Sequence, residues 1–302
     1  MVEFKQILCP VDLSELSLRP LAYAAAFAAL HDARLTALHV VPTFEPMQIR
    51  AGTLGYPVQI VQPVPKEEVL EALRKALEMV GGSTLDPMVA AEAGDAAEVI
   101  VDRAVAIPAD LLVMGTHGRQ GLDRVLLGSL TETVLHKAPC PVLTVPPHAP
   151  ATAPADVAFR HILCPMDFSP AAMQAFGFAM ALARRSDAAV TLIQAIEWLA
   201  GEEPRELAHF NIAEYRQILI NDAHARMQSL IADESGTWRN VRHVVEVGRA
   251  YREILRVASE IPADLIVMGA HGHGGPGLTP FGSTTHQVVR AARCPVLTVR
   301  GS

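Results

Sequence analysis

Glycine and hydroxyl residues recur in this chain at a spacing that suits phosphate binding. The pattern Gly-x-x-Gly, nine further residues and Gly-Ser occurs twice, 154 positions apart, at Gly115, Gly118, Gly128 and Ser129 and again at Gly269, Gly272, Gly282 and Ser283. Glycine lets backbone N–H groups approach an anion closely, and a helix that opens at Gly-Ser directs its first N–H groups and its dipole toward phosphate. Each copy directly follows a short apolar run. The pattern therefore predicts a phosphate-binding loop in each half.

An aspartate follows the first apolar run of each half. Cys9-Pro10-Val11-Asp12 returns as Cys164-Pro165-Met166-Asp167. A carboxylate repels phosphate but accepts hydrogen bonds from a ribose hydroxyl or an adenine amino group. Aspartate and glycine loop together therefore predict a nucleotide as ligand. The chain has no Gly-Lys-Ser or Gly-Lys-Thr, which excludes the P-loop of common NTPases.

The two copies belong to a longer internal repeat. Cys140-Pro141-Val142-Leu143-Thr144-Val145 recurs as Cys294 to Val299, and all matching segments lie 154 or 155 positions apart. Such constancy indicates a duplicated domain, and half of the 302 residues is a common size for one domain. A proline- and alanine-rich stretch separates the halves. We predict domain 1 over 1–146, a linker over 147–158 and domain 2 over 159–302.

Apolar runs and helical periods alternate along each half. In domain 1 we expect strands over 7–11, 35–41, 88–93, 111–114 and 142–145, with helices over 16–31, 66–80, 95–107 and 129–137, and domain 2 repeats this order. Near-continuous apolar strands separated by helices predict an α/β fold with a parallel sheet covered on both faces. Ligands of such sheets bind at the carboxyl ends of strands, near the point where strand order reverses. Asp12 and Gly115 are thus expected to face one crevice, and Ser14 and Ser169 are expected to cap the helices that follow them.

Composition and charge narrow the class of protein. Half of the residues are hydrophobic, 19% are charged and the net charge is −7, with no run of 18 apolar residues and no charged-then-apolar leader. These features favour a cytoplasmic protein without a membrane span. Nucleic-acid binding is not expected, because the chain lacks the Lys and Arg clusters that hold a phosphate backbone.

Cysteines and histidines give no metal or redox pattern. The four cysteines form no Cys-x-x-Cys pair, so we expect small buried thiols. His117 and His271 take the same loop position, but no further ligands can be named beside them, and no metal site is predicted.

Both halves resemble the universal stress protein family in its tandem, UspA-like form, and the resemblance covers nearly the whole chain. The doubled Gly-x-x-Gly, nine residues, Gly-Ser motif is typical of the ATP-binding branch of that family. The resemblance implies two Rossmann-like domains of the adenine nucleotide alpha hydrolase-like type, each a five-stranded parallel sheet of order 3-2-1-4-5 with helices on both faces. It also implies that the last strands, 142–145 and 296–299, can pair the domains within one chain; association into a homodimer stays open.

The resemblance further implies ATP, accompanied by Mg²⁺, at the ends of strands 1, 2 and 4. By matching position, Asp12 contacts the adenosine, Val40 pairs its backbone with the base, and the glycines and Ser129 hold phosphates. The residues expected around the nucleotide in domain 1 are Pro10, Asp12, Val40, Met114, Gly115, His117, Gly118, Arg119, Gly128, Ser129, Leu130 and Thr131. Those expected in domain 2 are Pro165, Asp167, Ala195, Met268, Gly269, His271, Gly272, Gly282, Ser283, Thr284 and Thr285.

The two halves differ in the nine-residue segment between the glycine pairs. Domain 1 carries Arg119, Asp123 and Arg124 there, whereas domain 2 has only His273 as a group that can be charged. Guanidinium groups make strong charge-assisted hydrogen bonds to phosphate, although exposed arginines often stay solvated and contribute little. We predict tighter ATP binding in domain 1.

Three classes of function follow from these features. An ATP-binding regulatory protein of the stress response is favoured by the motif pair and by the resemblance. A slow ATPase or nucleotidyl-transfer enzyme is the first alternative, although no paired acid and base or P-loop lysine lies in the motif regions, and no catalytic residue is predicted. A ligand-free interaction scaffold is the second.

Overall fold

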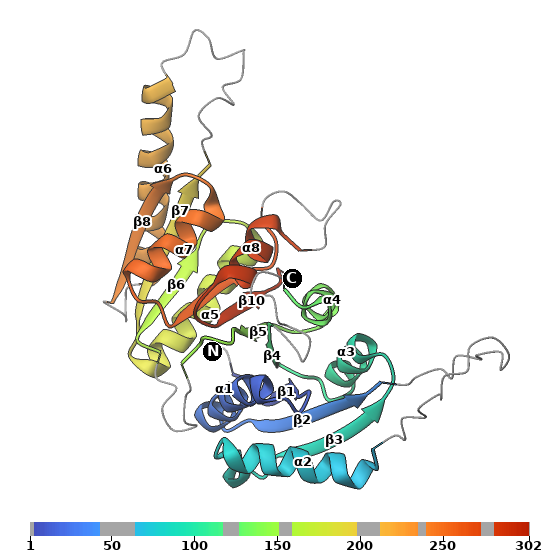
Figure 1. Cartoon of the computed structure of the whole chain (residues 1–302). Helices are drawn as coiled ribbons and strands as arrows, with labels where there is room; N and C mark the ends of the chain where they lie inside the picture. Colours follow the sequence, from blue (N-terminus) through green and yellow to red (C-terminus); the bar gives the residue numbers. More distant parts are fainter. Residues whose placement is uncertain are drawn as a thin grey trace, which may run out of the picture.

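A single sheet runs through both halves of the protein. The computed structural model describes residues 3–42, 64–116, 127–150, 159–197, 212–234, 240–272 and 281–301. Ten strands within these ranges form one sheet of order β3-β2-β1-β4-β5-β10-β9-β6-β7-β8 (Figure 1). Each half thus has the strand order 3-2-1-4-5 that the family resemblance implied, with all strands of a half parallel.

Domain 1 keeps the predicted order of elements. They are β1 (Gln6–Pro10), α1 (Glu15–His31), β2 (Arg34–Val41), α2 (Lys66–Met79), the 3₁₀ helix η1 (Gly82–Leu85), β3 (Met88–Ala93), α3 (Ala96–Ala106), β4 (Leu111–Gly115), α4 (Ser129–Lys137) and β5 (Val142–Val145). The predicted ends of the strands and α-helices differ from these by at most one residue. The short η1 helix was not predicted.

Domain 2 repeats this order after the linker. Its elements are β6 (His161–Pro165), α5 (Pro170–Ser186), β7 (Ala189–Ile196), α6 (Ile212–Glu234), β8 (Val241–Val247), α7 (Ala250–Glu260), β9 (Leu265–Gly269), α8 (Ser283–Ala291) and β10 (Val296–Val299). Residues 43–63, between β2 and α2, lie outside the described residues, and so do residues 151–158 of the predicted linker.

Two apolar layers cover the two faces of the sheet. Successive strand residues point to opposite faces, so Ile7 and Cys9 of β1 enter one layer and Leu8 enters the other. The first layer is covered by α1, α2, α5 and α6, and the second by α3, α4, α7 and α8 (Figure 1). Each layer contains residues of both domains. The two halves therefore share a continuous core.

The last strands of the two domains join them. β5 and β10 pair antiparallel, with Leu143 opposite Leu297. The hydroxyl of Thr144 donates to the carbonyl of Val296 at 3.2 Å, and the hydroxyl of Thr298 donates to the carbonyl of Val142 at 3.1 Å. These bonds relate equivalent residues of the repeat. The junction thus has local two-fold pseudosymmetry, and it confirms the expected pairing of the last strands within one chain.

Only one of the two predicted serine caps is correct. Ser169 accepts a hydrogen bond from the N–H of Ala172 at 3.2 Å and caps α5. Ser14 takes the N-cap position of α1, but its side chain caps nothing and instead donates to Oδ1 of Asp12 at 2.6 Å. The prediction for Ser14 was wrong because its hydroxyl turns to Asp12 as a donor, an orientation in which its oxygen accepts no N–H of α1. Ser169 has the same spacing from Asp167 but takes the capping orientation.

The four thiols are free and buried, as predicted. Burial raises the pKa of Cys140, Cys164 and Cys294 to about 12 each, and it also raises the pKa of Cys9. A buried thiol with a raised pKa stays protonated and unreactive.

Among the helices of the described residues, none is both long enough and apolar enough to cross a membrane.

Candidate functional site

A cavity of about 480 Å³ opens at the carboxyl ends of β6, β7 and β9 in domain 2. Asp167 comes two residues after β6, Ala195 lies near the end of β7, and Gly269 ends β9. All of the residues expected around a nucleotide in domain 2 line this cavity: Pro165, Asp167, Ala195, Met268, Gly269, His271, Gly272, Gly282, Ser283, Thr284 and Thr285. Segments more than 100 residues apart in the chain thus form one pocket.

A tight turn presents the aspartate in each half. Phe168 follows Asp167 and has φ 61°, and Leu13 follows Asp12 with φ 62°. Positive φ is uncommon for residues other than glycine and carries a cost in free energy. Oδ1 of Asp167 accepts the N–H of Ser169 at 2.9 Å, which offsets that cost and fixes the carboxylate at the end of β6.

The start of α8 forms the other wall of the cavity. Gly282 is its N-cap, and the N–H of Gly282 donates to the carbonyl of Ala270 at 2.9 Å. The hydroxyl of Thr285 donates to the carbonyl of Gly269 at 2.9 Å, so this hydroxyl ties the helix to the end of β9. Ser283 and Thr284 lie at the first turn of α8 and line the cavity. A helix start of this kind favours an anion.

Two glycines of the motif have packing roles that the sequence did not indicate. A Cβ atom on Gly269 would lie 2.9 Å from the backbone carbon of Ala171 and 3.0 Å from the nitrogen of Ala172, so its missing side chain makes room for α5. A Cβ atom on Gly272 would lie 2.5 Å from Oδ2 of Asp167. Larger residues at either position would displace α5 or the aspartate.

The described part of domain 1 shows the same construction. The hydroxyl of Thr131 donates to the carbonyl of Gly115 at 2.8 Å, and the N–H of Gly128 donates to the carbonyl of Thr116 at 3.0 Å. Nδ1 of His39 lies 2.7 Å from the carbonyl oxygen of Val11, beside the predicted base-pairing position Val40. The predicted site residues that complete this half, His117, Gly118 and Arg119, lie outside the described residues, together with Asp123 and Arg124.

The remaining lining residues of the domain 2 cavity were missed from the sequence. Met166, Ile193 and Ile254 give the cavity an apolar wall, and Ala172 and Ala250 contribute small side chains to its lining. Glu197 is the other missed residue, and its position directly after the predicted β7 was the one available signal. Asp167 and Glu197 together place two carboxylates on the β6–β7 side of the cavity.

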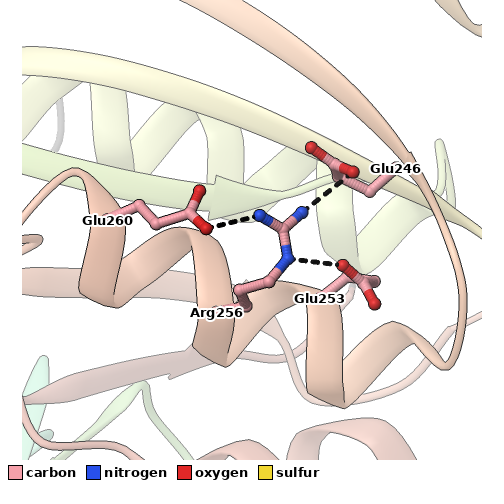
Figure 2. A network of polar contacts seen from close by, with 4 residues as sticks. All are labelled: Glu246, Glu253, Arg256 and Glu260. Atoms are coloured by element: carbon pink, nitrogen blue, oxygen red, sulfur yellow. Dashed lines mark hydrogen bonds and ion pairs between the residues drawn. The ribbon is translucent and has the colours of Figure 1, made fainter.

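Helix α7, which supplies Ala250 and Ile254, is tied to the sheet by a charged network on its outer side. Figure 2 shows Arg256 between Glu253 and Glu260 of the same helix and Glu246 of β8. The nitrogens of Arg256 lie 2.9 Å from Glu253, 2.6 Å from Glu260 and 2.9 Å from Glu246. The hydrogen bonds that Arg256 donates to these carboxylates raise the pKa of its guanidinium. Helix and strand are thereby held in register beside the cavity.

The titratable side chains of this cavity are Asp167, Glu197 and His271. No cluster of three or more His, Cys, Asp or Glu side chains that could hold a metal ion occurs in the described ranges.

Comparisons with known proteins agree with the fold and the repeat. The sequence model of the universal stress protein family matches residues 3–146 and 158–300. A universal stress protein of Mycolicibacterium smegmatis is 28% identical over 97% of this chain and 96% of its own length. One of Methanocaldococcus jannaschii is 36% identical over 146 residues, which are 47% of this chain and 82% of that protein. The crystal structure of a universal stress protein from Archaeoglobus fulgidus superposes with a TM-score of 0.65 at 22% identity and covers 99% of this chain and 98% of its own.

Proposed function

Since this chain belongs to the universal stress protein family, with two tandem domains, we propose that it is a regulatory protein of the stress response that binds ATP. The observation that carries the proposal is the cavity in domain 2. The glycine, serine and aspartate positions predicted for a nucleotide surround one space of about 480 Å³ at the strand ends where ligands of such sheets bind.

The proposed ligand lies across the ends of three strands. Its phosphates bind at the start of α8, where Ser283 and Thr284 offer hydroxyls beside the helix N–H groups. Its ribose faces Asp167 on β6, and its base lies toward Ala195 on β7, against the apolar wall. Mg²⁺ enters bound to the phosphates of ATP.

Domain 1 is proposed to be the tighter site. This part of the proposal rests on the sequence, in which Arg119 and Arg124 offer guanidinium groups that domain 2 lacks. A cytoplasmic location, a homodimer and the absence of nucleic-acid binding also stay predictions from the sequence.

Equilibrium dialysis with labelled ATP tests the proposal. Wild-type protein is expected to retain ATP, and Gly128→Glu and Gly282→Glu are each expected to lose the site of their own domain, because they add a carboxylate at the helix start. Gly177→Ala, a change in α5 with nothing within 4 Å of the added carbon, is the control. No retention of ATP by the wild type would refute the proposal and favour a ligand-free scaffold.

A slow ATPase is the second candidate function, and an assay of the same protein preparation distinguishes it from ATP binding without hydrolysis. Phosphate released over hours and abolished by Asp12→Ala with Asp167→Ala would favour the enzyme. ATP retained without turnover favours a purely regulatory role.

A further inference from the structure

The two nucleotide sites differ at the position that follows the second strand. Glu197 lies directly after β7 and lines the cavity of domain 2. Its counterpart in domain 1, 155 positions earlier, is Pro42, directly after β2. A carboxylate that accepts hydrogen bonds thus stands in one half where the other half has a side chain without polar atoms.

A hydrogen bond holds Glu197 in place. Its Oε1 accepts the N–H of Ala250, the first residue of α7, at 3.0 Å. In domain 1 the equivalent helix is capped by Asp95, which accepts from the N–H groups of Ala97 and Glu98. The residue at that position in domain 2 is Arg249, whose side chain makes no cap bond. Glu197 therefore takes over part of the cap through Oε1, and the same residue lines the cavity, so this bond leaves its second oxygen, Oε2, as the acceptor available to a ligand.

The polar groups of the cavity are ordered from one side to the other. The start of α8 lies beyond β9, Asp167 follows β6, and Glu197 follows β7. Strand β6 lies between β9 and β7 in the sheet, so the anion-binding end and Glu197 stand about two strand spacings, or roughly 10 Å, apart. Glu197 repels phosphate and accepts from a donor, which orients a ligand with its phosphates at α8 and a donor-bearing group at β7.

On the basis of the proposed function, the geometry points to Glu197 as the residue by which domain 2 selects purine bases that carry an exocyclic amino group in the position of adenine's. The amino group of ATP donates to Oε2 of Glu197. ITP has a carbonyl oxygen in the same place, and that oxygen faces the carboxylate with no proton between them. A hydrogen bond to a charged group gives about tenfold or more in affinity. Domain 1, with Pro42, lacks this contact and discriminates less.

Competitive titration of the full chain with ATP and ITP tests this inference. Every protein in this titration carries Gly128→Glu, which is expected to abolish nucleotide binding in domain 1. Each protein is checked for a native circular dichroism spectrum. We expect the domain 2 site to bind ATP about tenfold or more tightly than ITP. In Glu197→Gln the amide oxygen can keep the bond to Ala250 and turn its NH₂ group to the ligand, so the ratio of ATP to ITP affinity is expected to fall to about one or below. Glu197→Ala is expected to bring the ratio close to one.

The control is Glu71→Gln, at an exposed position of α2 in domain 1 and outside the cavity lining, which is expected to leave the ratio as in the parent. If Glu197 only caps α7, Glu197→Ala lowers stability but neither variant changes the ratio, and that result would overturn this inference while leaving the proposed function intact. If neither nucleotide binds the wild type, the proposed function itself fails and this inference fails with it.

Discussion

Glu132 and His286 take the same position in the two repeats and contact each other across the junction of the domains. Oε1 of Glu132 in α4 lies 3.6 Å from Nε2 of His286 in α8. Both helices begin at a Gly-Ser pair of the phosphate motif. The two candidate nucleotide sites are therefore linked through neighbouring helices as well as through the shared sheet.

This contact predicts a salt-dependent change in stability. His286→Glu places two carboxylates at equivalent positions across the junction, and their repulsion is expected to lower the urea midpoint at low ionic strength. Both side chains are partly exposed, so the loss should disappear in 1 M NaCl, where charges are screened within about 3 Å. His286→Gln at the same salt concentrations is the control. An equal loss in 1 M NaCl would contradict an electrostatic cause.

Arg300 connects the end of domain 2 to domain 1. Its guanidinium donates to the carbonyl of Leu135 at 2.9 Å and to that of His136, in the last turn of α4. Arg300→Ala removes charge-assisted bonds to a helix C-terminus and is expected to cost about 1.5–3 kcal/mol in the free energy of unfolding. Chemical unfolding measures this cost. Arg293→Ala, at an exposed position, should change it little, and equal effects of the two would show that the contact of Arg300 is not stabilising.

The burial of His31 predicts that the protein loses stability in acid. Its ring packs against Phe4 at 4.8 Å between centroids, and neither ring nitrogen has a hydrogen-bond partner. Burial, reinforced by the charge of Arg185, lowers the pKa of His31 from 6.5 to about 4. The unfolded chain therefore binds a proton between these values that the native protein does not, and stability falls as the pH drops from 6.5 toward 4.

His31→Gln cannot take up that proton. We expect its urea midpoint to fall less than that of the wild type between pH 7 and pH 4.5. The control is the exposed His148→Gln, which should follow the wild type. Parallel losses in wild type and His31→Gln would exclude His31 as the cause.

Two glycine substitutions are predicted to act in opposite directions. Gly269→Ala puts a carbon 2.9 Å from the backbone of Ala171 and is expected to cost about 1–3 kcal/mol in stability. Gly177 lies in the middle of α5 on its exposed face, and a Cβ atom there would meet nothing within 4 Å. Gly177→Ala is expected to raise the free energy of unfolding by about 0.4–1 kcal/mol, because alanine restricts the unfolded chain. Thermal and urea unfolding of both variants provide the comparison. A stable Gly269→Ala would mean that α5 does not need this close approach.

The elements of the fold could be predicted from the sequence because the strands are short apolar runs and the helices have clear ends. Ser169, for example, caps α5 at the predicted position. The order 3-2-1-4-5 came only from the family resemblance, because periodicity does not determine which strands are neighbours. The orientation of Ser14 could not be predicted, because Ser169 has the same spacing from Asp167 and caps its helix, whereas Ser14 donates to Asp12.

The motif residues of the candidate site could be predicted because two copies mark the same positions. The apolar wall could not, since Ile193 and Ile254 resemble any buried residue until the register of β7 and α7 places them at the cavity. Gly269 and Gly272 were assigned to phosphate from the pattern, whereas their close approaches to Ala171 and Asp167 require the packed structure. The placement of Glu197 at the cavity could not be predicted either, because its side chain is held by the N–H of Ala250 at the start of α7, and this contact exists only in the folded protein.

Calorimetric titration of nucleotide-stripped protein with magnesium ATP measures directly whether both domains bind the nucleotide. We predict two sites of unlike affinity, with the tighter one abolished by Asp12→Ala and the weaker one by Asp167→Ala. The absence of binding heat at several temperatures would contradict nucleotide binding by this protein.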